Sequence, residues 1–269
     1  MTTPAGIQYG SGFRYGVVYQ LNANGRLKGS SAATPYSGQP FVGHRAWNLQ
    51  IPQQRRIFHI NADRVGAADF LPPTETARAT INVDADNQVL DAILTGNKQV
   101  AIGTAQTIAD LTSNQGFEPI IALLLYQQSI DAATGLRAWR SYLIPRAKAI
   151  PMLSGFADRE VPGSYDVMMT PTSTNIFGAA LTALTDGATD AQLFRAMTAG
   201  RPAIMAWKAD GYTQDFTFPA GFTPAVSTSS ITVWSDGTKL SAGFTLTTSG
   251  VHFSVAPAAD TDINIFWEF

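Results

Sequence analysis

Residues 119–150, PIIALLLYQQSIDAATGLRAWRSYLIPRAKAI, decide the fold class of this chain. The run Ile120–Tyr126 is apolar throughout, which is typical of a β-strand covered on both faces. Asp131–Gly135 (DAATG) has the length of a hairpin loop. Leu136–Ile150 is the returning strand, with Arg146 and Lys148 on one face and Ala147 and Ala149 on the other. The segment therefore predicts a β-hairpin with arms of about a dozen residues, longer than the usual strand of about 5–6 residues.

Short apolar and alternating segments on both sides of this hairpin predict a mainly β chain. Further strands are expected at Phe13–Leu21, Phe41–Ile51, Arg55–Ala62, Thr76–Val83, Gly163–Thr172 and 203–207. One short helix is expected where Val89, Leu90, Ile93 and Leu94 form an apolar stripe that ends at Gly96, and another at Asp190–Ala199. Lys28–Pro40, rich in small residues and turn formers, is expected to be a long loop that either binds a ligand or docks on a neighbour.

Residues 209–269 are expected to form a second, smaller domain after a first domain at 1–208 that ends with the 203–207 strand. The strands of this second domain are predicted at Ile231–Trp234, Phe244–Thr247, Val251–Val255 and Ile263–Phe269. Asp236-Gly237 marks a tight hairpin turn. Residues 211–269 carry a charge of −4 and residues 1–210 a charge of +2, which supports a boundary near 208–215. A small immunoglobulin-like β-sandwich fits this pattern.

The composition limits the classes of function. The net charge of −2 excludes a strongly basic nucleic-acid binder, and no cysteine is present for a disulfide, a thiolate zinc site or a cysteine nucleophile. Ile120–Tyr126, the longest apolar run, is too short to span a bilayer, and no signal peptide or membrane anchor is expected. Arg outnumbers Lys 13 to 5, and Asp outnumbers Glu 16 to 4. This bias fits either a loop-rich β protein or a subunit covered by copies of itself.

No catalytic, cofactor-binding or metal site is predicted, because no hydrolase, phosphate-loop, dinucleotide or zinc-protease motif is present. Gly10-Ser11-Gly12 is interpreted as a loop before the first strand. The paired acidic residues are interpreted as helix caps, ion pairs or turns; they are Asp84 with Asp86, Asp158 with Glu160, and Asp260 with Asp262. The remaining candidates, His44, His59, His252 and the pair Arg55-Arg56, are interpreted as ordinary strand or surface positions.

The five tryptophans leave a carbohydrate-binding alternative open. They are Trp47, Trp139, Trp207, Trp234 and Trp267. An exposed aromatic ring on a β-sandwich can stack on a sugar, and Trp234 breaks from the face of Ile231 and Val233. Packing of Trp234 against the first domain is the competing interpretation, and it is the favoured one.

Residues 76–172 resemble the tail tube proteins of long-tailed bacteriophages. The resemblance lies in the order of Val89–Gly96, the hairpin 119–150, Ile144–Ile150, Gly155–Glu160 and the strand Tyr165–Pro171. Residues 233–240 and 244–251 are similar to small β domains appended to phage structural proteins. The long N-terminal region and the extra C-terminal module depart from the simplest tube subunits, which keeps a minor tail or connector protein open.

The resemblance implies a virion protein, made in the host cytoplasm, that assembles without cofactors into stacked hexameric rings. Its fold would be a tail-tube-type β-sandwich that joins its neighbours in one continuous inner barrel. Its partners would be copies of itself and the tape measure, terminator and distal tail proteins, and double-stranded DNA would pass through the lumen without specific binding. Two alternatives are a carbohydrate- or receptor-binding protein of the particle and a hydrolase whose site assembles from residues far apart in sequence. Residues 211–269 are expected to be dispensable for assembly, and the loop Lys28–Pro40 is expected to reach an adjacent ring.

Overall fold

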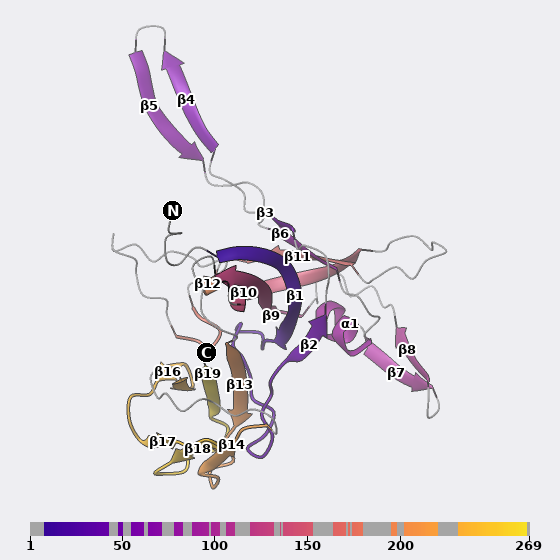
Figure 1. Ribbon diagram of the computed structural model, residues 1–269, viewed down its shortest axis with the longest axis vertical. Coiled ribbons are helices and arrows are strands. Elements are labelled where there is room, and N and C mark those ends of the chain that lie inside the picture. The colour runs from indigo at the N-terminus through magenta and orange to yellow at the C-terminus, as the bar shows by residue number, and fades with distance from the viewer. Residues whose placement is uncertain are drawn as a thin grey trace.

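The chain folds as a mainly β protein, as the sequence predicts (Figure 1). The structure is a computed structural model that describes residues 8–42, 48–50, 55–61, 64–71, 78–82, 88–96, 98–102, 106–110, 119–131, 135, 137–152, 164–170, 172, 174–179, 195–197, 202–219 and 231–267. Within these ranges the only helix is α1 (Gln88–Thr95). Every pair of neighbouring strands is antiparallel.

The largest sheet has eight strands. In spatial order they are β2 (Gln39–Val42), β1 (Gln8–Gln20), β9 (Ile121–Asp131), β10 (Arg137–Met152), β11 (Ser164–Met169), β6 (Arg78–Asn82) and β3 (Asn48–Gln50), and β12 (Arg195–Met197) also pairs with β10. The predicted hairpin is present as β9 and β10, with Ile130 opposite Arg137. The register between these strands shifts between Ile144 and Ala147, around Pro145, because proline has no N–H for the ladder.

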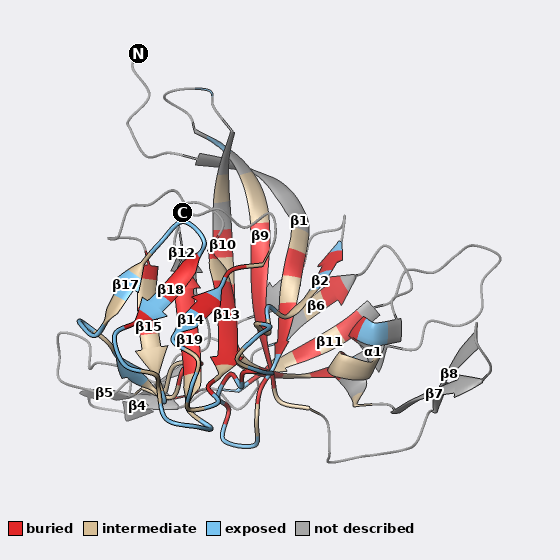
Figure 2. Cartoon of the chain, turned by 90° about the horizontal axis from the view of Figure 1, so that it is seen from below, coloured by how far each residue is buried: buried red, intermediate tan, exposed pale blue. Residues whose placement is uncertain are grey.

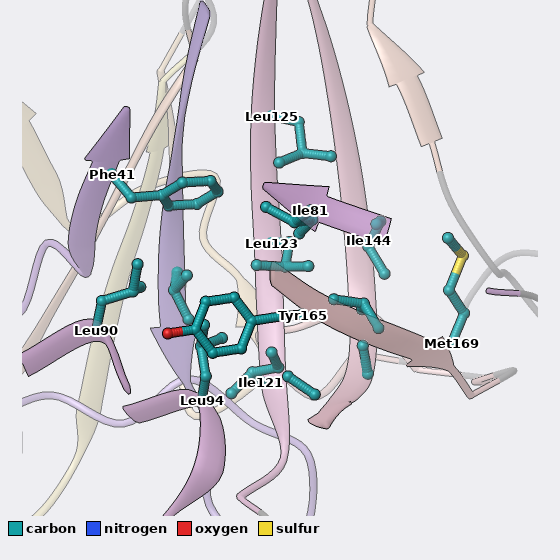
Figure 3. Packing of buried hydrophobic residues seen from close by; sticks show 14 residues of the cluster. Phe41, Ile81, Leu90, Leu94, Ile121, Leu123, Leu125, Ile144, Tyr165 and Met169 are labelled. Atoms are coloured by element: carbon teal, nitrogen blue, oxygen red, sulfur yellow. The ribbon is translucent and has the colours of Figure 1, made fainter. Parts of the chain in front are cut away.

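Both faces of β9 are covered, which confirms the interpretation of its apolar run. Ile121, Leu123 and Leu125 enter one buried cluster, and Ala122 and Leu124 enter another. The first cluster, here called the body core, lies between the large sheet and α1 (Figure 3). It consists of Val18, Phe41, Ile81, Leu90, Leu94, Ile121, Leu123, Leu125, Ile144, Ala147, Ala149, Tyr165, Val167 and Met169.

Helix α1 forms where the sequence predicts it. Leu90 and Leu94, one turn apart, are buried against the body core, and Ile93 packs beside them. Val89, which the sequence analysis placed on the same stripe, is 50 % exposed and is a correction. Gly96 ends the helix with φ of 73°, and its N–H donates to the Ala92 carbonyl at 2.9 Å.

The C-terminal part is a sandwich of two sheets. One sheet has the order β13 (Ala203–Lys208), β19 (Asp262–Trp267), β15 (Ile231–Ser235) and β16 (Thr238–Lys239), and the other has β14 (Asp215–Thr217), β18 (Gly250–Phe253) and β17 (Phe244–Leu246). Asp236 and Gly237 have φ of 45° and 83°, the conformation of the predicted tight turn. The core between the sheets, the module core, consists of Met205, Trp207, Ala209, Phe216, Phe218, Ile231, Val233, Val251, Phe253, Ile263 and Ile265.

A third cluster joins this sandwich to the large sheet. This junction core consists of Tyr19, Leu21, Leu27, Ala122, Leu124, Tyr126, Leu143, Ile176, Phe177, Ile204, Ala206 and Phe266. Strand β13, expected as the last strand of the first domain, pairs with β19 over its whole length. It therefore contributes Ile204 to the junction core and Trp207 to the module core.

The predicted long loop lies along the outer edge of β13 in the same chain. Residues 28–38, here called the strap, pair there through Tyr36 and Ala206, whose N–H groups donate to each other's carbonyl at 2.7 and 3.0 Å. The Lys208 N–H donates to the Ser31 carbonyl at 3.1 Å. The strap thus supplies the hydrogen bonds that an edge strand lacks, so its expected role in reaching another ring is not supported.

Two local predictions are wrong. Gly10-Ser11-Gly12 lies inside β1 and not in a loop: Gly10 pairs with Ser129 of β9, and the register shifts between Gly10 and Phe13. Residues 195–197 form β12 and not part of a helix, because they pair with Ser141–Leu143 of β10. The structure also contains two hairpins that the sequence analysis did not predict as such: β4 (Arg55–Asn61) with β5 (Arg64–Leu71), and β7 (Lys98–Ile102) with β8 (Gln106–Asp110).

Candidate functional site

The distal ends of β1, β9 and β10 form a three-stranded ribbon that extends past the strands beside it (Figure 2). Strand β2 covers β1 only at Tyr15–Val18, and β12 covers β10 only at Ser141–Leu143. Within the described part of the chain, no strand pairs with residues 8–14 of β1 on the side away from β9, or with residues 137–140 of β10 on the side away from β9. Two backbone edges are therefore free for pairing.

Aromatic side chains stiffen one face of this ribbon at its base. The rings of Tyr15 and Tyr126 stack with centroids 4.4 Å apart, and Trp139 meets Tyr15 edge-on at 5.7 Å. The Tyr126 hydroxyl donates to the Pro202 carbonyl at 2.5 Å, which ties the ribbon to the C-terminal sandwich. On the opposite face the Tyr142 hydroxyl bonds Gln127 Oε1 at 3.1 Å. The free edges are thus held on a fixed support.

The described residues contain no cluster of three side chains able to hold a metal ion. His252 and Asp215, on neighbouring strands, form an exposed pair with Nδ1 and Oδ1 2.8 Å apart. The sequence analysis missed this partner because the two residues are 37 positions apart. The one signal available was the period-two alternation that places both side chains on the outer face of the small sheet.

The carboxylates of the final loop serve turns and contacts within the chain, as predicted. Asp260 has φ of 68° and its Oδ1 lies 2.6 Å from Lys208 Nζ, which lowers the pKa of Asp260 and raises that of Lys208. Asp262 accepts a hydrogen bond from the Gly29 N–H at 3.1 Å. Its own N–H donates to Asp236 at 2.9 Å. Asp262 therefore joins the strap to β19 and the β15–β16 turn.

Replacing Asp262 by Asn is expected to raise the melting temperature at pH 7. Burial raises the pKa of Asp262, so the folded state binds its proton more tightly than the unfolded state does. The carboxylate therefore costs stability as the pH rises above the ordinary pKa of an aspartate side chain, about 3.9, whereas the Asn oxygen still accepts from Gly29. The gain over wild type should disappear as the pH approaches 4 in thermal unfolding followed by circular dichroism.

The matched control is Asp262→Ala, which removes both the acceptor and the titrating group, and should therefore be about 1 kcal/mol less stable than Asp262→Asn at every pH. Equal melting temperatures of the Asn and Ala variants across this pH range would show that the Gly29 contact contributes nothing.

The tryptophans pack inside the protein where they are described. Trp234 stacks on Phe177 with centroids 5.2 Å apart and is partly buried beside the junction core, which confirms the packing interpretation. Trp207 is fully buried in the module core, and its Nε1 has no hydrogen-bond partner in the described part of the chain. The backbone of Trp267 pairs with Ala203 and Ile231.

The other predicted candidates are only partly placed. Arg55, Arg56 and His59 lie on β4, and only their backbone is described. Several candidates lie outside the described residues, namely His44, Trp47, Asp84, Asp86, Asp158, Arg159 and Glu160.

No helix in the described ranges is both long and apolar enough to cross a bilayer. No protein-family model matches the chain, and no curated protein matches it.

Proposed function

We propose that this chain is a structural subunit that assembles with its own copies, through free sheet edges, into rings of the phage tail tube type. The observation that carries the proposal is the order β1-β9-β10-β12 in a sheet with a free edge at residues 8–14. Such rings, stacked, would enclose a conduit for DNA, and the chain would act without a catalytic, cofactor or metal site.

The strand directions of this four-stranded unit suit ring closure. β1 and β10 are parallel to each other, because each is antiparallel to β9. β12 runs against β10, so it also runs against β1. When β12 of one copy pairs with β1 of the next, the antiparallel alternation continues across the boundary without interruption. The two joining edges differ from each other, so the contact is heterologous, and its repetition forms a ring when the rotation between neighbouring copies closes.

The stagger required by a closed barrel matches the position of the free edge. Strands about 4.8 Å apart, tilted by about 40°, shift by roughly 16 Å over four strands, or about 5 residues. Ala196 of β12 pairs with Tyr142 of β10, and Tyr142 pairs with Leu125 of β9. Leu125 in turn pairs with Gly16 of β1, so Ala196 and Gly16 lie at the same level of the sheet. Five positions along β9 from Leu125 reach Ile130, which lies opposite Tyr9, because the register of β1 shifts twice between Gly10 and Tyr15. The shifted strand therefore falls on the uncovered stretch of β1, beside Gly10 and Ser11.

The charge balance also supports a DNA conduit. A wall that bound phosphates tightly would hold DNA in place, because each neutralised phosphate adds to the affinity. The chain carries a net charge of only −2. Transit of DNA without specific binding is therefore compatible with its charge.

A cysteine pair is expected to link copies at the proposed boundary. The chain has no cysteine, so Ser11→Cys with Ala196→Cys adds the only thiols. Within one chain β9 and β10 separate these positions by about 14 Å, beyond the roughly 7 Å limit for a disulfide. Oxidation should give a ladder of covalent oligomers on a non-reducing gel, and negative-stain electron microscopy should show rings.

Gly10→Cys with Ala196→Cys samples the opposite face of β1, and Ser11→Cys with Thr238→Cys is the control, because β16 belongs to the C-terminal sandwich. Monomers alone from both test pairs, together with the absence of rings from the wild-type protein, would refute the proposal.

A further inference from the structure

The end of the C-terminal sandwich presents a large side chain to solvent on a fixed turn. Tyr212 is 89 % exposed, the highest value among the large apolar residues described. Asp210 holds the turn through its Oδ1, which accepts from the N–H groups of Tyr212 and Thr213 at 2.8 and 2.7 Å, and through its Oδ2, which accepts from the Thr213 hydroxyl at 2.7 Å. These bonds lower the pKa of Asp210 to about 2. The backbone is ordered, yet the ring has no partner in the described part of the chain.

Further exposed groups lie at the same end. Val255 is 75 % exposed and follows directly on the segment where the Phe253 N–H donates to the Gln214 carbonyl at 2.9 Å. Asp215 and His252 pair on the adjoining strands. The Tyr212 surface, as it is called here, consists of Asp210, Tyr212, Asp215, His252 and Val255. An aromatic ring near carboxylates suits a guanidinium group, which can stack on the ring and pair with the carboxylates.

The arginines of this protein are all outside that module. All 13 lie within residues 1–201, whereas residues 211–269 have five acidic residues, one lysine and no arginine. Three of them, Arg55, Arg56 and Arg64, belong to the β4–β5 hairpin. Residues 55–71 also contain Asp63 and Asp69, so this segment has a net charge of +1 against −4 for residues 211–269. The two regions therefore have complementary charge.

The β4–β5 hairpin also lacks a described support of its own. It is a two-stranded sheet that pairs with no other strand in the described ranges, and it stands away from the large sheet and from the C-terminal sandwich (Figure 1). A lone hairpin is at best marginally stable in water, so a partner surface would stabilise it.

We infer that the Tyr212 surface of one copy binds the arginine-bearing β4–β5 hairpin of a second copy. The contact stacks a guanidinium on Tyr212 and pairs arginine with the Asp215 carboxylate. This inference rests on the proposed self-assembly and adds a second, electrostatic contact to the pairing of sheet edges. Its strength falls with salt, because exposed charges are screened within about 10 Å at 0.1 M.

The test cross-links two separately prepared chains. Val255→Cys is mixed with Ala68→Cys, which lies on β5, and treated with a short bis-maleimide; Ala67→Cys samples the other face of the hairpin. We expect a covalent dimer of the two chains, and a yield about fivefold lower when Tyr212→Ala or Asp215→Lys is added. Arg56→Glu on the hairpin partner should lower the yield, and Arg56→Glu with Asp215→Lys should restore part of it.

Ser241→Cys, on another exposed part of the module, replaces Val255→Cys as the control. Equal yields from these two positions, or a yield indifferent to Tyr212→Ala and Asp215→Lys, would overturn the inference. If rings or the Ser11–Ala196 ladder still form in that case, the proposed function stands without this contact. If neither forms, both proposals fail.

Discussion

Deletion of residues 211–269 is expected to leave a chain that no longer folds stably. Strand β13 loses its only described strand partner, β19, and the junction core loses Phe266 and the neighbouring Trp234. Loss of one buried aromatic side chain costs about 3–5 kcal/mol, against a total stability of about 5–15 kcal/mol for a typical domain. The sequence alone suggested the opposite, a dispensable appendage, so this experiment separates the two interpretations.

The measurement is the yield of soluble protein followed by thermal unfolding. Phe266→Ala in the full-length chain is the milder companion variant, and it should lose about 3 kcal/mol in urea unfolding while still folding. A truncated chain that is soluble and unfolds cooperatively at the wild-type temperature would show that the junction core does not hold the two parts together.

Gly29→Ala is expected to detach the strap from β13. A Cβ at this position would lie 2.0 Å from the Trp207 carbonyl carbon and 2.4 Å from the Lys208 nitrogen. Both are backbone atoms, and β13 is held by its pairing with β19, so the strap must move instead. The bonds of Ser31, Tyr36 and Asp262 described above would then be lost, at about 1 kcal/mol each, for a total near 3–4 kcal/mol.

Urea unfolding measures this loss, and limited proteolysis should show new cleavage within residues 28–38. Gly243→Ala is the control, because its added Cβ meets nothing within 4 Å and its cost, about 1 kcal/mol, comes from a φ of 87° alone. A loss for Gly29→Ala no larger than that of the control, with the strap still protected, would mean that the close approach to Trp207 relaxes freely.

The candidate interface was predictable only in part. The long hairpin follows from the composition of residues 119–150, but its free edges depend on how far β2 and β12 extend along their neighbours. Residues 195–197 have an apolar pattern that fits a helix, yet pairing with β10 makes them a strand. A three-residue strand has too little local signal to be recognised, because its conformation is set by a partner about 50 residues away in the chain.

The sequence by itself determined the features that depend on near neighbours. The unbroken apolar run of β9 specified two buried faces, Leu90 and Leu94 with Gly96 specified α1 and its end, and Asp236-Gly237 specified a tight turn. Each of these rests on side-chain periodicity or on backbone freedom within a few residues. The tertiary structure alone decided that β13 belongs to the C-terminal sheet, that the strap covers its edge and that Asp215 meets His252. These pairings join segments far apart in sequence, and many alternative pairings satisfy the same local pattern until packing selects one.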